Sequence, residues 1–203
     1  MNSKIFQSKY KEVFGTLYAS EDSKALVIIF PGINYDHNKP LLYYAKKAAI
    51  QNNNDVLCIS YKDKISWEDI GKASTEDVAS EIAYIIKRLI NKNYKSIYFL
   101  GKSIGTQIAG LTASKLNIHN IEFIYLTPIE QTLKYIIDRK CTVVVGTKDE
   151  FFQSNYINTI KEHKSVSLML FEGANHSLEI KNDVIKNLRI LENVVKLYVD
   201  FFK

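Results

Sequence analysis

Short apolar runs, each about the length of one buried strand, alternate along this chain with longer stretches of helical spacing. Six of these runs are nearly continuous in aliphatic and aromatic residues: Ala25–Phe30, Val56–Ile59, Ile97–Leu100, Ile121–Leu126, Thr142–Val145 and Val166–Leu170. A strand that is apolar at almost every position is covered on both faces, as in a parallel sheet. A further strand is expected near the N-terminus, at Val13–Tyr18.

The segments between the runs carry apolar residues at spacings of three and four, which is typical of helices packed on one side. They are Leu41–Gln51, Thr75–Asn91, Ile104–Leu116 and Asp183–Phe202. Alternating strands and helices predict an α/β three-layer sandwich around a mostly parallel, doubly wound sheet. The 203 residues suit one domain and contain no linker or repeat, so residues 1–203 are predicted to form a single domain.

Composition excludes several classes of protein. The apolar fraction of 46% argues against disorder, and the net charge of +5 is spread along the chain without the basic block that nucleic-acid binding favours. No apolar stretch approaches the ~20 residues of a membrane span, and Met1–Tyr18 lacks the features of a signal peptide. We therefore expect a cytoplasmic protein with no nucleic-acid or membrane partner, whose oligomeric state the sequence does not reveal.

The run Ile97–Leu100 leads into Gly101-Lys102-Ser103-Ile104-Gly105 and then into a helical pattern. A Gly-x-Ser-x-Gly sequence between a strand and a helix indicates a sharp turn that lifts the serine hydroxyl clear of the sheet. The two glycines allow the strained backbone and the close approach of helix and strand. Ser103 is therefore a candidate nucleophile.

The residues Gly101-Lys102-Ser103 could also end a phosphate-binding loop of the form Gly-x4-Gly-Lys-Ser. That loop needs a glycine at position 96, which is Ser96, and the intervening residues Ile97–Leu100 form an apolar strand. No room is left for a phosphate cradle, so nucleotide binding is disfavoured.

An acid and a histidine follow two later strands. Asp149 lies in the turn after Thr142–Val145, and His176 lies in the loop after Val166–Leu170. In a doubly wound fold the carboxyl ends of the strands gather the chemistry at one edge of the sheet. Ser103, Asp149 and His176 are therefore expected to meet there as a catalytic triad.

These three turns resemble those of α/β-hydrolase-fold serine hydrolases, whose triads run along the chain as serine, acid and histidine. The resemblance extends from about Val13 to the end of the chain. It implies that Ser103 is the nucleophile, that His176 is the general base, and that Asp149 orients the imidazole.

In that family the loop after the strand before the first helix completes the oxyanion hole. The matching residues here are Phe30-Pro31-Gly32-Ile33-Asn34, in which Pro31 departs from the family's usual His-Gly and Gly32 is kept. Because the hole uses a backbone N–H one residue past the glycine, the resemblance implies the N–H groups of Ile33 and Ile104 as donors.

The interval from Thr127 to Lys140 has only 14 residues, where family members often insert a cap domain. It can hold one short helix, such as Glu130–Ile137, and no cap. We therefore predict an open, shallow site. Its expected substrate-binding walls are Tyr35, Thr127, Ile129 and Phe151.

Other candidates for the triad roles are weaker. Glu150 adjoins Asp149 but should point elsewhere from the same turn, and His37 follows the oxyanion loop, in a polar segment that is more typical of a surface. His119 and His163 fall in helix-to-strand connections, at the opposite end of the sheet, where exposed surface positions are expected.

The two cysteines, Cys58 and Cys141, do not form a Cys-x-x-Cys pair, and no cluster has metal-ligand spacing. In the strand order of the resembled family, their strands lie about four positions apart, roughly 19 Å, which is beyond disulfide reach. We expect two free, buried thiols and no metal or cofactor.

The resemblance implies hydrolysis of a small-molecule carboxylic ester or thioester through an acyl-enzyme. Two alternatives stay open at this point: a peptidase or amidase of the same fold, and a hydrolase-fold binding module without catalysis. The complete triad argues against the module, and the fold itself does not define the substrate.

Overall fold

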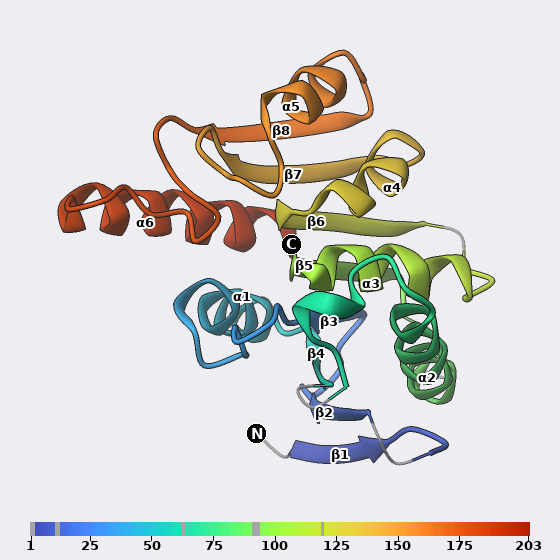
Figure 1. Ribbon diagram of the computed structural model, residues 1–203. Helices are drawn as coiled ribbons and strands as arrows, with labels where there is room; N and C mark the ends of the chain where they lie inside the picture. Colours follow the sequence, from blue (N-terminus) through green and yellow to red (C-terminus); the bar gives the residue numbers. More distant parts are fainter. Residues whose placement is uncertain (1–2, 11–12, 62–63, 91–93, 119) are drawn as a thin grey trace.

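The computed structural model describes residues 3–10, 13–61, 64–90, 94–118 and 120–203, and in them eight strands form one sheet (Figure 1). The strands are β1 Ser3–Gln7, β2 Phe14–Tyr18, β3 Ala25–Phe30, β4 Asp55–Ser60, β5 Ser96–Ser103, β6 Ile121–Pro128, β7 Cys141–Gly146 and β8 Val166–Phe171. The helices are α1 Pro40–Gln51, α2 Ala73–Leu89, α3 Ile104–Ser114, α4 Leu133–Ile137, α5 Ser154–Lys161 and α6 Val184–Phe201, with short 3₁₀ turns η1 Trp67–Asp69 and η2 Glu130–Thr132.

The sheet is mostly parallel and doubly wound, as predicted. Its strand order is β1-β2-β4-β3-β5-β6-β7-β8, with β1 and β2 antiparallel to their neighbours and the strands from β4 to β8 parallel to one another. The chain winds outward from the centre in both directions. β3 and β5 therefore lie side by side at the point where the winding changes direction, which is where such sheets place their chemistry.

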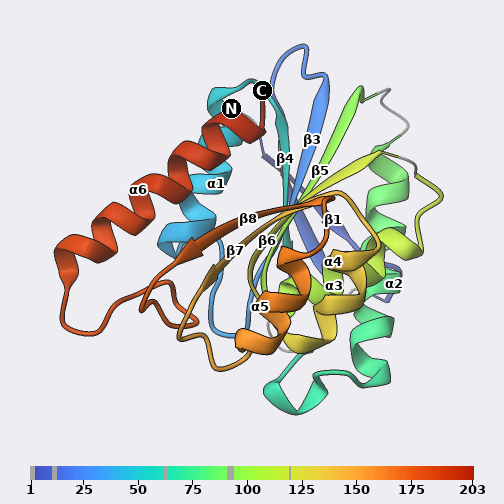
Figure 2. The same ribbon diagram turned by 90° about the horizontal axis from the view of Figure 1, so that it is seen from above.

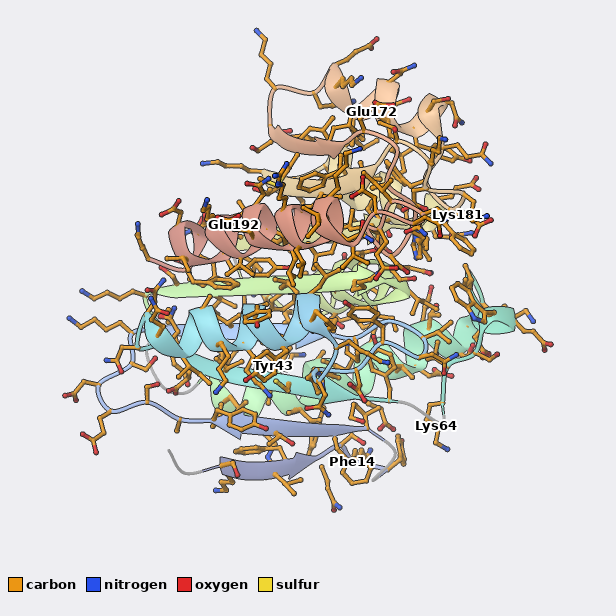
Figure 3. The ribbon with its side chains drawn as sticks, turned by 90° about the vertical axis from the view of Figure 1, so that its left-hand side faces the viewer. Phe14, Tyr43, Lys64, Glu172, Lys181 and Glu192 are labelled. Atoms are coloured by element: carbon orange, nitrogen blue, oxygen red, sulfur yellow. The ribbon has the colours of Figure 1, made fainter. Side chains whose placement is uncertain are left out.

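Helices cover both faces of the sheet, which confirms the three-layer architecture. Figure 2 shows α1 and α6 together on one face, with α2, α3, α4 and α5 on the other. Each face has its own apolar core, one centred on α1 and α6 and the other on α2 and α3. In Figure 3 the first of these faces turns toward the viewer, with Glu192 marking α6 and Tyr43 marking α1.

Every strand predicted from an apolar run is present, and most are longer by one to three residues at an end. The edge strand β1 was not predicted because its only apolar residues are Ile5 and Phe6, and Ile5 is 67% exposed. The predicted helix Thr75–Asn91 is observed as α2, which ends at Leu89, and Asn91 lies outside the described residues. The sequence reasoning also missed α5 and η1.

No cap domain is inserted between β6 and β7. That interval holds only η2 and α4, which together match the short helix predicted at Glu130–Ile137. Cys58 and Cys141 are free and buried on β4 and β7, four strand positions apart. Across the described ranges, no helix is both long enough and apolar enough to cross a membrane.

Candidate active site

Ser103 lies at a sharp turn between β5 and α3, at the centre of the sheet. Its backbone has φ of 56° and ψ of −126°, a region that non-glycine residues rarely enter and that costs on the order of 1–3 kcal/mol. A side chain at Gly101 would approach the carbonyl oxygen of Gly105 to 2.6 Å, and one at Gly105 would approach the Phe30 oxygen to 2.4 Å. The two glycines are therefore required for this turn to pack.

The hydroxyl of Ser103 lies at one end of a line of three hydrogen-bonding side chains. His176 Nε2 is 2.9 Å from Ser103 Oγ, and His176 Nδ1 is 2.9 Å from both carboxylate oxygens of Asp149. Asp149 is buried, with an exposed fraction of 3%, and it also accepts a bond from the Phe151 N–H at 2.9 Å. In this arrangement the carboxylate holds the imidazole so that Nε2 faces the serine hydroxyl.

Backbone contacts hold the turn that carries Asp149 against the loop that carries His176. The Lys148 N–H donates to the Ala174 carbonyl at 2.9 Å, and the Gly173 N–H donates to Thr147 Oγ1 at 2.8 Å. A side chain at Gly146 would meet the Ala174 oxygen at 2.0 Å, so only glycine allows this approach. The separation between Asp149 and His176 is thus set by the backbone of both loops.

The loop after β3 lies directly against the serine turn. A side chain at Gly32 would come within 3.3 Å of Ser103 Cβ, and Gly32 and Tyr35 exchange two backbone hydrogen bonds of 3.2 Å that close a tight turn around Ile33. Ile104 is the first residue of α3, so its N–H has no acceptor within the helix. The oxyanion role of the Ile33 and Ile104 N–H groups stays a prediction.

Solved structures resemble this chain over nearly its whole length, whereas no model of a known protein family and no curated protein matches it. Est1E from Butyrivibrio proteoclasticus has a TM-score of 0.75 at 12% identity, over 99% of this chain and 97% of that one. An α/β serine hydrolase homologue from Coxiella burnetii gives 0.67 at 14%, over 100% and 97%. The chain has the α/β-hydrolase fold.

A third similar structure also has no lid over its fold. A serine hydrolase without a lid from Xanthomonas campestris resembles this chain with a TM-score of 0.63 at 12% identity, over 97% of this chain and 94% of that one. The α/β-hydrolase fold without a cap is therefore a known arrangement. Identities this low establish the shared fold and do not extend to the substrate.

The four predicted wall residues divide into two pairs in this α/β-hydrolase fold. Phe151 is half-buried and its ring lies 4.6 Å from that of His176, while Tyr35 is half-buried on the loop after β3. Thr127 has no exposed surface and Ile129 only 1%, because both side chains turn into the protein. Only Tyr35 and Phe151 therefore present surface from which a wall could be built.

The sequence reasoning overlooked Trp67. It lies on η1, between β4 and α2, and its ring stacks on Phe151 at 5.1 Å with an interplanar angle of 15°. Because Phe151 in turn contacts His176, three rings form a row that leads from the protein surface to the imidazole. A lone tryptophan in a polar loop was the only signal for this contact in the sequence.

Lys102, inside the Gly-x-Ser-x-Gly turn, also has an unexpected environment. Its side chain is 2% exposed, and burial lowers the pKa of its ammonium group from 10.5 to about 8, although the nearby Asp149 carboxylate acts in the opposite direction. The amine donates to Thr127 Oγ1 at 2.6 Å and to the His176 carbonyl at 3.0 Å. A lysine is thus buried beside the histidine loop.

The remaining candidates lie away from the line of three side chains. Glu150 is exposed, and it is Asp149 that reaches His176. His37 is half-buried, and burial lowers its pKa to about 4. His163 is half-buried rather than exposed as predicted, because it lies in a tight turn before β8, and His119 lies outside the described residues.

A metal site is not evident among the side chains that the structure describes. No group of three or more His, Cys, Asp and Glu residues there is placed to hold a metal ion. The polar groups that converge at the serine turn are the Ser103 hydroxyl, the His176 imidazole and the Asp149 carboxylate.

Proposed function

We propose that this protein is a serine hydrolase that cleaves a carboxylic ester or thioester through an acyl-enzyme. The observation that carries the proposal is the unbroken line from Ser103 Oγ through both ring nitrogens of His176 to Asp149, at the carboxyl end of a central strand. A serine hydroxyl becomes an effective nucleophile when an adjacent base can take its proton, and a buried carboxylate orients that base.

In the proposed mechanism Ser103 Oγ attacks the carbonyl carbon while His176 Nε2 takes the hydroxyl proton. The resulting imidazolium is stabilised by Asp149 and returns the proton to the leaving alcohol or thiol. The negative charge on the carbonyl oxygen is held by the backbone N–H groups of Ile33 and Ile104, each worth about 2.7–4 kcal/mol. Water, activated by His176, then hydrolyses the acyl-enzyme and restores Ser103.

Similar structures support an ester as substrate without defining it. Est1E is also known with ferulic acid bound, and a protein described as an esterase from Pyrococcus furiosus resembles this chain with a TM-score of 0.66 at 14% identity. The short interval between β6 and β7 leaves the serine turn without a cap. We therefore propose small or solvent-exposed acyl groups as substrates, since a long buried chain needs a deep enclosed pocket.

A panel of acyl nitrophenyl esters, acyl thioesters and anilides tests this function. We expect turnover of short-chain esters or thioesters, and a loss of about 10⁴-fold or more in kcat/KM for both S103A and H176A. The matched variants S80A and H163A change the same residue types elsewhere and should retain activity. Anilide cleavage alone would indicate an amidase, and a strong preference for long acyl chains would contradict the open site.

A further inference from the structure

Lys102 connects three segments that build the site through a side chain that is almost entirely buried. Its ammonium group donates to Thr127 Oγ1 at the end of β6 and to the His176 carbonyl in the loop after β8. The same nitrogen lies 5.0 Å from the centre of the Tyr35 ring, on the loop after β3. A cation over an aromatic face is attracted by the ring's quadrupole, so one buried amine holds all three segments.

The partner Thr127 is itself in an unusual conformation. The pairing of β5 with β6 shifts register between Lys102 and Ser103, so that Ser103 is paired with Pro128 and Thr127 is left as an extra residue. Thr127 has a φ of 40°, which is a rare and strained value for a β-branched residue. Strain of this kind persists only where the surrounding structure imposes it, and it concentrates at functional sites.

Tyr35 extends this connection to the oxyanion loop. Its backbone closes the turn around Ile33 through the two bonds to Gly32, and its hydroxyl accepts a bond from the Leu41 N–H at 3.1 Å, at the start of α1. The contact with Lys102 thus reaches the segment that presents the Ile33 N–H. The contact with the His176 carbonyl reaches the residue that is proposed to take the proton from Ser103.

A buried lysine is costly unless its charge is used. Lys102 has no carboxylate within ion-pairing distance among the described residues, and its polar contacts are a neutral hydroxyl and a neutral carbonyl. A methionine or leucine would fill the same space without the desolvation cost of an ammonium group. The charge therefore requires an explanation beyond packing.

We propose that the charged amine of Lys102 is a positioning element of the active site, which holds the His176 carbonyl, the Thr127 bulge and the Tyr35 loop in their working arrangement. The titratable groups around this amine are the Asp149 carboxylate, whose charge acts on it from the turn after β7, and the Tyr35 ring from the loop after β3, while His176 contributes its backbone carbonyl. The inference rests on the proposed function of Ser103, and it predicts that the reactivity of Ser103 depends on the charge of Lys102.

The rate of covalent labelling of Ser103 by a fluorophosphonate tests this without knowledge of the natural substrate. In the wild type we expect the rate to fall about fivefold or more between pH 8 and pH 9.5 as the Lys102 ammonium group deprotonates. In K102M we expect a rate at pH 7.5 that is about 10-fold to 100-fold lower, without the alkaline fall. T127V, which removes the hydroxyl acceptor, should show a smaller loss in the same direction.

The matched control is K87M, which makes the same change at an exposed lysine on α2, away from the site, and should leave the rate and its pH profile unchanged. A K102M rate equal to the wild type, or a wild-type rate that stays level up to pH 9.5, overturns the inference. The second result needs no variant, so the test stands even if K102M fails to fold. A folded wild type that is not labelled at all overturns the proposed function, and the inference with it.

Discussion

Replacing Lys102 by methionine should change how stability depends on pH, because burial has weakened the proton affinity of the amine. Its pKa falls from 10.5 in an exposed lysine to about 8 in the folded protein. Below pH 8 both states hold the proton, and the buried ammonium opposes folding in full, by about 3 kcal/mol at 1.36 kcal/mol per pKa unit. As pH rises from 8 toward 10.5, the folded state releases the proton first, and this opposition disappears.

The magnitude can be worked out for an accessible range. Linkage between pH 7 and pH 9.5 gives the wild type a gain of about 2 kcal/mol relative to K102M, which has no titrating group at this position. Since both proteins share all other ionisable groups, the difference between them isolates the contribution of Lys102. K102M also loses the contacts to Thr127 and the His176 carbonyl. This loss shifts the free energy of unfolding of the variant by a constant amount at every pH.

Urea unfolding of both proteins at pH 7, 8.5 and 9.5 measures this difference. For a slope of about 2 kcal/mol per M, the gap between the two midpoints should change by roughly 1 M in favour of the wild type across the series. The exposed-lysine variant K87M should follow the wild type. If the wild type and K102M keep a constant gap at all three pH values, Lys102 does not carry a buried charge and the reasoning is refuted.

Other expectations follow from single contacts. D149N should lower kcat for the ester identified in the panel by about 10³-fold to 10⁴-fold, with the circular dichroism spectrum unchanged. The kcat of E150Q, at the exposed neighbour, should stay within about twofold of the wild type. Equal effects of the two variants would contradict the assignment of the acid. Y125F should raise the free energy of unfolding by about 1 kcal/mol, since the buried Tyr125 hydroxyl has no partner among the described residues, and a lower melting temperature would count against this. Burial raises the pKa values of the Cys58 and Cys141 thiols to about 12. Neither thiol should therefore react with a disulfide reagent in the native protein at pH 8, and both should react in guanidinium. Fast labelling of the native protein would contradict this.

Much of the fold could be predicted because its strands are buried on both faces. Runs such as Ala25–Phe30 are apolar at every position and coincide with strands of the observed sheet. The edge strand β1 could not be found in this way, since four of its five residues are exposed and most of them are polar. The serine turn was also predictable, because its two glycines are required by local approaches of the backbone.

The environment of the site was less accessible from sequence because it depends on contacts between distant segments. In the sequence Lys102 is an ordinary polar residue in a turn. Its side chain is buried because the Thr127 bulge and the histidine loop, 25 and 74 residues away, pack around it. Thr127 and Ile129 were expected to face the substrate, yet the bulge turns Thr127 toward Lys102. Trp67 on η1 stacks on Phe151 from a segment far away in the sequence, so no local pattern could signal that contact.

The central claim is that Ser103 is a nucleophile activated by His176, and mapping a covalent adduct tests it most directly. The wild type is treated with a fluorophosphonate at pH 7.5, digested and analysed by mass spectrometry, beside H176A and the matched variant H163A. We expect one adduct on Ser103 in the wild type and in H163A, and almost none in H176A. A folded wild type with no adduct, or with its adduct on another residue, would contradict the account.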